Sequence, residues 1–86
     1  MKYIKFHVKQ EIEEKILYKH ALPIEEVLLS LKEGKPKMRK ANKDLIFVVT
    51  RHLRYITIFF ELKNKVGTIK TAYPSPKQHI RWYHKK

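Results

Sequence analysis

The sequence predicts a single α+β domain, with two N-terminal helices packed on a three- to four-stranded antiparallel meander and a C-terminal helix after it. Three observations favour this class. Apolar residues recur at helical spacing in the first third of the chain, strand-like runs fill the middle, and short connections join the strands. The 86 residues fit one domain spanning residues 1–86. Because a domain of this length has a thin core, we expect a functional site on an open sheet face or in a shallow cleft.

Two amphipathic helices are expected in the first third of the chain. The first spans residues 9–20, and its apolar side is marked by Val8, Ile12, Ile16 and Leu17. Pro23 fits the first position of the second helix, and Gly34 fits its C-terminal stop. The buried stripe of this second helix consists of Ile24, Val27, Leu28 and Leu31. Before both helices, residues 3–8 alternate weakly between apolar and polar types, which predicts a short edge strand.

Strand patterns dominate the chain after Gly34. A basic connector comes first, at residues 35–43, and it is either a loop or an edge strand. One apolar run and two alternating segments then predict three consecutive strands, at residues 45–50, 55–62 and 68–73. The short turns between them favour antiparallel pairing. Pro74 ends the last strand, and a short helix is expected over residues 77–84.

The formal net charge is +12, and it is distributed unevenly along the chain. The first 33 residues hold six basic and six acidic side chains, whereas residues 34–86 hold fourteen basic and two acidic ones. A folded domain with such an excess attracts polyanions. Surplus lysine can also serve only to keep a protein in solution, but a solubilising bias would not omit the first third. The sequence therefore predicts RNA or another polyanion as the partner.

The composition excludes or disfavours several classes of function. The chain has no cysteine, which excludes disulfides and thiolate metal sites and fits a reducing cytoplasm. It has no apolar run of the roughly 20 residues that span a membrane and no apolar signal-peptide core, so no membrane partner is expected. The two glycines cannot form a glycine-rich phosphate loop, and the five histidines lack the spacing of metal ligands. We expect neither a cofactor nor a metal site.

The side chains left for chemistry are histidine, lysine, arginine, tyrosine and threonine, and this set suits metal-independent RNA cleavage. That reaction needs a base for the 2′-hydroxyl, an acid for the leaving 5′-oxygen, and cations near the phosphate. Histidine titrates near neutral pH and can fill either proton role, while lysine and arginine hold the phosphate. A passive RNA-binding domain has a similar composition, so both interpretations stay open.

Three segments of the chain resemble a known family. Residues 19–27 read Lys-His-Ala-Leu-Pro-Ile-Glu-Glu-Val, residues 45–50 read Leu-Ile-Phe-Val-Val-Thr, and residues 68–74 read Thr-Ile-Lys-Thr-Ala-Tyr-Pro. They are similar, in that order, to the Lys-His-Gly-hydrophobic-x-Phe-Glu-Glu-Ala junction, the Phe-Val-Val strand and the Ile-Arg-Ile-Ile-Ser-Ala-Arg strand of BrnT-type toxins. The Thr-Ala-Tyr-Pro ending also resembles the last strand of the wider barnase–EndoU–colicin–RelE superfamily of ribonucleases. The chain departs from the BrnT pattern at Ala21 and Tyr73, and it has an extra strand over residues 55–62.

The resemblance implies a RelE/BrnT-like fold and an endoribonuclease that is the toxin of a type II toxin–antitoxin pair. Its partners would be RNA, free or as ribosome-bound mRNA, and a cognate antitoxin that covers the basic face. The superfamily resemblance also implies that one face of the last strand is the active one. Thr71 and Tyr73 lie two residues apart, so both side chains point to one face, where they would orient the phosphate and assist proton transfer.

Other candidate residues are expected around this strand. His20 or His52 would act as base or acid, and the phosphate would be neutralised or contacted by Arg51, Arg54, Lys70, Lys77, Arg81 and Tyr83. Each site also has an ordinary structural interpretation. Threonine and tyrosine favour sheets, a histidine at a helix C-terminus complements the helix dipole, and residues 51–54 form a solvated hairpin.

Two other functions compete with the ribonuclease. A non-catalytic nucleic-acid-binding protein on the same scaffold predicts salt-sensitive binding without cleavage. A structural or regulatory protein-binding module predicts negligible affinity for nucleic acid at about 0.15 M salt, where long-range attraction is largely screened.

Overall fold

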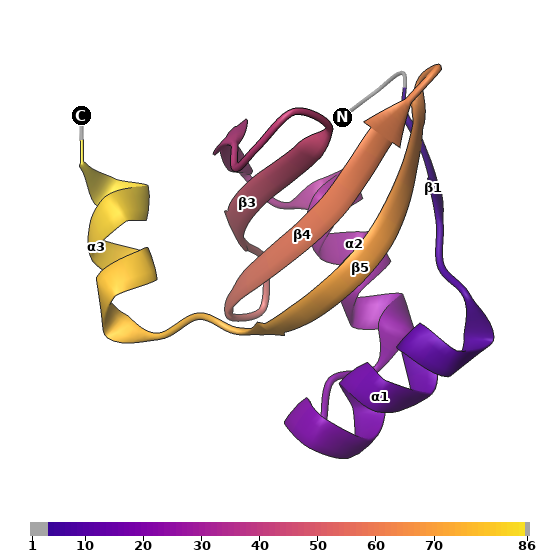
Figure 1. Ribbon diagram of the computed structural model, residues 1–86. Coiled ribbons are helices and arrows are strands. Elements are labelled where there is room, and N and C mark those ends of the chain that lie inside the picture. The colour runs from indigo at the N-terminus through magenta and orange to yellow at the C-terminus, as the bar shows by residue number, and fades with distance from the viewer. Residues whose placement is uncertain (1–3, 86) are drawn as a thin grey trace.

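The computed structural model describes residues 4–85 (Figure 1). Its elements along the chain are β1 (Lys5–His7), α1 (Gln10–His20), α2 (Ile24–Glu33), β2 (Lys37–Lys40), β3 (Leu45–Arg51), β4 (Tyr55–Lys63), β5 (Val66–Pro74) and α3 (Lys77–His84). The predicted helices and the α+β class are confirmed. The first residue of the predicted edge strand, Tyr3, lies outside the described residues. No helix within residues 4–85 is both long enough and apolar enough to cross a membrane.

The strands form one five-stranded mixed sheet in the order β1-β5-β4-β3-β2. Strands β2 to β5 pair antiparallel, whereas β1 pairs parallel with β5. The predicted three- to four-stranded antiparallel meander is therefore wrong in strand number and in the direction of β1. The basic connector, left open between loop and strand, forms β2 on the edge beside β3.

Packing of Phe6 explains why β1 lies beside β5. The Phe6 ring meets the Phe60 ring edge-on, with 5.0 Å between centroids. Gly67 in β5 makes room for it, because a Cβ atom at this position would lie 2.8 Å from the Phe6 ring. This contact joins segments about sixty residues apart in the sequence, so local alternation cannot reveal it.

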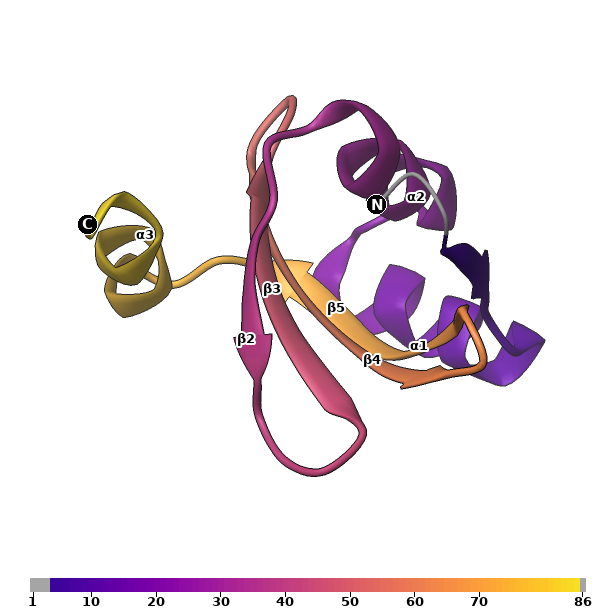
Figure 2. The same ribbon diagram turned by 90° about the horizontal axis from the view of Figure 1, so that it is seen from above.

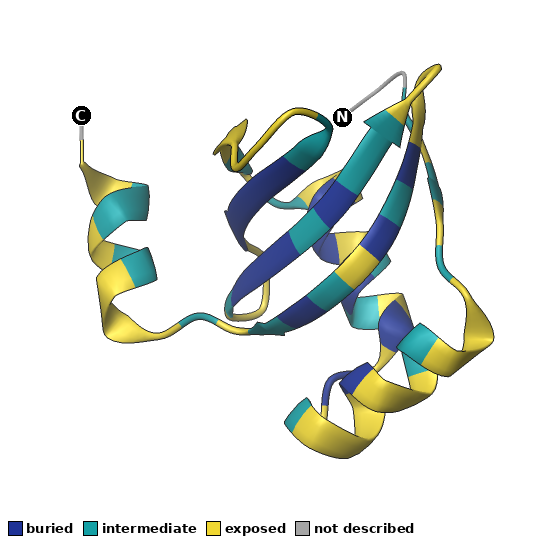
Figure 3. Cartoon of the chain, viewed as in Figure 1, coloured by how far each residue is buried: buried dark blue, intermediate teal, exposed yellow. Residues whose placement is uncertain are grey.

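The two faces of the sheet are covered differently (Figure 2). Helices α1 and α2 lie on one face, and their contact with the sheet forms the main core. Its buried members are Ile16, Leu22, Ile24, Val27, Leu31, Ile46, Val48, Ile56, Ile58, Phe60, Ile69 and Ala72. Helix α3 lies on the other face and contributes no buried residue (Figure 3). The α3 side of β4 and β5 is therefore only partly covered, and this is the kind of open sheet face on which a functional site was expected.

Candidate nucleic-acid-cleaving site

Two rows of side chains cross the sheet on its α3 side, and we call this surface the α3 face. One row runs through directly paired positions of β2, β3, β4 and β5: Arg39, Phe47, Phe59 and Thr71. The next row consists of Lys37, Val49, Thr57 and Tyr73. Paired residues in adjacent strands point to the same face. Phe47 and Phe59 therefore lie between Arg39 and Thr71, and Val49 and Thr57 lie between Lys37 and Tyr73. Thr71 and Tyr73 are half-buried and not sealed in the interior.

Thr57 fixes the start of α3 on this face. Its hydroxyl group, on a residue with no exposed surface, lies 2.8 Å from the Ser75 hydroxyl and 2.9 Å from Nδ1 of His79. A buried hydroxyl needs such partners, because an unsatisfied polar group costs about 1–3 kcal/mol. The Thr57–Ser75–His79 network therefore sets the position of the His79 ring and leaves its Nε2 outside the network.

His79 lies among aromatic rings and next to a cation. Its ring centroid is 5.1 Å from that of Phe47 and 6.0 Å from that of Tyr73. Burial lowers the pKa of His79, and the positive charge of Arg39 lowers it further. Both effects favour the neutral imidazole, which is the form that accepts a proton.

His20 reaches Tyr73 from α1, which lies on the other face of the sheet from α3 (Figure 2). It is the last residue of α1, and the centroids of its ring and the Tyr73 ring are 5.7 Å apart. Strand β1 pairs only with residues 66–68 of β5, so the later part of β5 has an open edge around which His20 reaches. Burial raises the pKa of the Tyr73 phenol, which therefore keeps its proton at neutral pH. The result is a row of three ionisable rings, His20, Tyr73 and His79.

A cationic and aromatic cleft of about 280 Å³ opens beside His79. Its walls include Phe47 and Trp82, and the Arg39 guanidinium lies 5.3 Å and 5.6 Å from the centroids of these two rings. Lys37 lies 4.5 Å from the Trp82 ring and donates hydrogen bonds to two carbonyls at the end of α3. Lysine at this end also complements the helix dipole, so β2 holds α3 in place.

A β-bulge in β5 changes the direction that strict alternation would give the Lys70 side chain. In the β4–β5 register, Phe59 pairs with Thr71 and Phe60 pairs with Ile69, so Lys70 has no partner on β4. Strict alternation would send Lys70 and Thr71 to opposite faces. With the bulge, both residues line one small cleft beside His20.

The other predicted site residues lie outside the His20–Tyr73–His79 row. His52 is exposed in the hairpin between β3 and β4, and Arg54 donates two hydrogen bonds to Glu26 and one to the carbonyl of Ala21. Arg51 lies 5.3 Å from the centroid of the Tyr55 ring. The α3 residues Lys77 and Arg81 are exposed, and the Tyr83 hydroxyl donates to the carbonyl of Lys35. Of the four predicted catalytic residues, the structure brings together His20, Thr71 and Tyr73.

Sequence reasoning missed four residues of the site, namely Arg39, Thr57, His79 and Trp82. The sequence places His79 and Trp82 in the short helix expected over residues 77–84, but it does not indicate which groups their side chains meet. Thr57 shares one face of its strand with Tyr55 and Phe59, so its face is predictable from alternation, but its partner on α3 is not. Arg39 belongs to the segment whose structure the sequence left open.

Replacing Arg39 with glutamine is expected to raise the pKa of His79, because one of the two causes of its lowering is removed. In the unmodified protein we expect this pKa below its ordinary value of about 6.5. NMR titration of the His79 ring protons measures both values, with Lys40→Gln as a control on the other side of β2. A wild-type pKa at or above about 6.5, or no rise in Arg39→Gln, contradicts the placement of these groups.

Acidic groups are scarce on the α3 face. Glu61 is the acidic residue whose register places it there, and it lies 3.9 Å from Lys63. No three histidine, aspartate or glutamate side chains within residues 4–85 gather as metal ligands. The site can therefore supply two imidazoles, a phenol, hydroxyls and several cations. Comparison with protein-family models and with curated proteins finds no match for the chain.

Proposed function

We propose that this protein is a metal-independent endoribonuclease. The observation that supports it best is the Tyr73 ring between His20 and His79, at centroid distances of 5.7 and 6.0 Å, on a cationic and aromatic face. Transfer of a phosphoryl group from one oxygen to another needs a base on the entering side and an acid on the leaving side. Two imidazoles beside one phenol, carried by helices on opposite faces of the sheet, meet this need without a metal ligand set.

His79 acts as the general base in this proposal. The scissile phosphate lies over Thr71 and Tyr73, whose hydroxyls donate to its non-bridging oxygens. Nε2 of neutral His79 takes the proton from the 2′-hydroxyl, and the 2′-oxygen forms a bond to phosphorus. The P–O5′ bond breaks, and His20 in its imidazolium form gives a proton to the departing 5′-oxygen. The products are a 2′,3′-cyclic phosphate and a 5′-hydroxyl, and water exchanges the two protons afterwards.

Thr57 and Ser75 are positioning residues for this base. When Nδ1–H of His79 donates to Oγ1 of Thr57 and the Thr57 hydroxyl donates to Ser75, Nε2 is left unprotonated. The lowered pKa of His79 keeps this form populated at neutral pH. The hydrogen-bond network thus supplies both the orientation and the tautomer that proton abstraction needs.

The cleft beside His79 suits an unpaired base. Sequence-specific and general RNA-binding proteins stack exposed bases on aromatic rings and guanidinium planes, at about 1–3 kcal/mol per base. Arg39, Phe47 and Trp82 offer these surfaces within one cleft of about 280 Å³. A base next to the scissile phosphate bound there would hold the 2′-hydroxyl close to His79.

The finer assignment of fold and role rests on the resemblance described above. In this proposal the domain has a RelE/BrnT-like scaffold, acts in the cytoplasm as the toxin of a toxin–antitoxin pair, and cleaves free or ribosome-bound mRNA. An acidic antitoxin would cover the α3 face and neutralise its cations. A neighbouring small gene that encodes an acidic protein would favour this role.

Purified protein is expected to cleave single-stranded RNA in the presence of EDTA. Tyr73→Phe and Thr71→Ala should lower the rate because each removes a hydroxyl beside the phosphate, whereas Tyr18→Phe, an exposed tyrosine on α1, should have no effect. Gel analysis of end-labelled RNA, alone and with ribosomes, measures the rates. RNA that stays intact under both conditions removes the proposal of an enzyme.

Non-catalytic RNA binding is the second candidate, and the contacts of Arg39 with two aromatic rings favour it specifically, because stacking alone needs no catalytic group. It predicts salt-sensitive binding that persists in Tyr73→Phe and Thr71→Ala, without any cleavage. Measuring affinity and cleavage on the same variants separates the two functions.

A further inference from the structure

A small cationic cleft lies between α1 and the bulge of β5, and we call it the α1–β5 cleft. It encloses about 120 Å³ and is lined by Ile12, Lys15, Ile16, Lys19, His20, Lys70 and Thr71. A small anionic group such as a phosphate fits a cleft of this size.

The charged side chains that line the α1–β5 cleft have one sign. Three lysines and a histidine line it, and no carboxylate does. Lys15 and Lys19 are four residues apart on α1, a spacing at which like charges repel. The two ion pairs found within residues 4–85 lie elsewhere, between Arg54 and Glu26 and between Lys63 and Glu61. An anionic ligand would relieve this repulsion.

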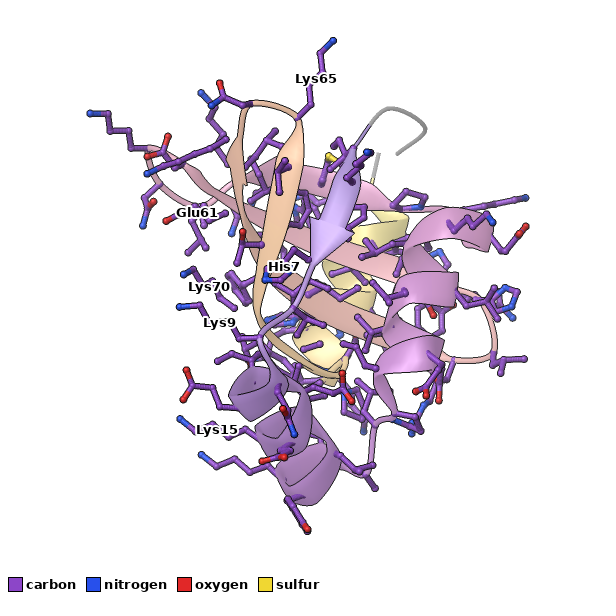
Figure 4. The ribbon with its side chains drawn as sticks, turned by 90° about the vertical axis from the view of Figure 1, so that its right-hand side faces the viewer. His7, Lys9, Lys15, Glu61, Lys65 and Lys70 are labelled. Atoms are coloured by element: carbon purple, nitrogen blue, oxygen red, sulfur yellow. The ribbon has the colours of Figure 1, made fainter. Side chains whose placement is uncertain are left out.

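The bulge in β5 is what completes the cluster. Figure 4 shows Lys70 extending to the same side of the molecule as Lys15 and Lys9, which come from α1 and from the residue before it. In a regular strand, Lys70 and Thr71 would point to opposite faces, and the cleft would lose one of them. The extra residue thus places an ammonium group and a hydroxyl beside the lysines of α1.

We propose that the α1–β5 cleft binds a backbone phosphate of the RNA strand, on the His20 side of the phosphate that reacts. The placement of this phosphate relative to the reacting one rests on the proposed function. His20 and Thr71 line the cleft and also border Tyr73, so the two phosphates belong to neighbouring nucleotides. The strand then runs across the α3 face from the Arg39–Trp82 cleft, past Tyr73, to the lysines of α1. An ammonium group holds a phosphate as a point charge, and several of them suit a flexible backbone.

The test uses a short 2′-O-methyl RNA, which has no free 2′-hydroxyl to attack and is therefore not cleaved. Each phosphate in turn is replaced by an uncharged methylphosphonate, and binding is measured for the wild type and for Lys15→Gln/Lys70→Gln. A matched control, Lys32→Gln/Lys43→Gln, loses the same charge from exposed positions outside the cleft. For the wild type we expect one position at which neutralisation weakens binding about tenfold, the loss of one charge-assisted contact.

The cleft variant should bind the RNA with all its phosphates about tenfold more weakly than the wild type does. Neutralising the phosphate at that position should not weaken its binding further, whereas the control variant should still lose affinity there. For the cleft variant, the magnitude of the slope of log affinity against log salt should fall by about 0.7, the value for one phosphate contact on a single strand. Equal losses in the two variants at every position would show that RNA binding responds to net charge alone, and would overturn the phosphate site. Position-specific coupling without cleavage of ordinary RNA supports the cleft and removes only the enzyme. Cleavage without such coupling removes only the cleft.

Discussion

Replacing His79 with glutamine is expected to lower the rate of RNA cleavage by about 10²- to 10⁴-fold, the range of a positioned general base. Glutamine fills similar space and can still bond to Thr57, but its side chain does not accept a proton at neutral pH. The fold should survive, because α3 contributes no buried residue to the core. Single-turnover cleavage of an end-labelled RNA measures the loss, and thermal unfolding of the same samples checks the fold.

His7→Gln is the matched control for this substitution. His7 is an exposed histidine in β1, and its replacement should leave the cleavage rate unchanged. The affinity for uncleavable RNA should change little in His79→Gln, because the lost function is proton abstraction. Similar rates for His79→Gln, His7→Gln and the wild type would exclude His79 as the base.

Replacing Phe60 with alanine is expected to lower the free energy of unfolding by about 3–5 kcal/mol, as for other fully buried phenylalanines. Phe60 has no exposed surface, lies in β4 facing α1 and α2, and packs edge-on against Phe6. At about 0.05–0.15 kcal/mol per residue, a domain of this length has roughly 4–13 kcal/mol in total. The substitution therefore removes a large share of the stability and loosens β1 from the sheet. Urea unfolding followed by circular dichroism measures it.

Phe59→Ala provides the comparison, because Phe59 is the adjacent residue and points to the other face. Its ring is only half-buried and packs against Phe47, so the loss of stability should be clearly smaller. Phe59→Ala should instead weaken RNA binding, since it removes part of the aromatic row on the α3 face. A loss of stability as large as that of Phe60→Ala would contradict the assignment of the two faces.

The elements whose signals are local could be predicted from the sequence. The helix expected over residues 9–20 is Gln10–His20, the one over 77–84 is Lys77–His84, and the strand over 55–62 is Tyr55–Lys63. Periodicity of 3.6 or 2 residues and the positions of proline and glycine carry this information. The parallel pairing of β1 with β5 and the bulge at Lys70 depend on contacts between distant segments, so no local pattern shows them.

The candidate site shows the same division. Alternation placed Thr71 and Tyr73 on one face, and the end of α1 brings His20 to them. His79 could not be assigned, because its role depends on α3 folding back onto Thr57. The net charge of a segment does not fix where each of its side chains lies. The first third of the chain is neutral in total, yet its Lys15 and Lys19 line the α1–β5 cleft.

In the proposed reaction, the 2′-hydroxyl attacks the phosphate with histidine as base and acid and without a metal. The most direct measurement compares, in EDTA, an RNA that is cut at one position with the same RNA carrying a single 2′-deoxy nucleotide on the 5′ side of that position. We expect the all-ribose RNA to yield a 2′,3′-cyclic phosphate and a 5′-hydroxyl at this site, and the 2′-deoxy RNA to stay intact there. Cleavage of both RNAs at the same rate, or cleavage only when a divalent metal is added, would contradict the account.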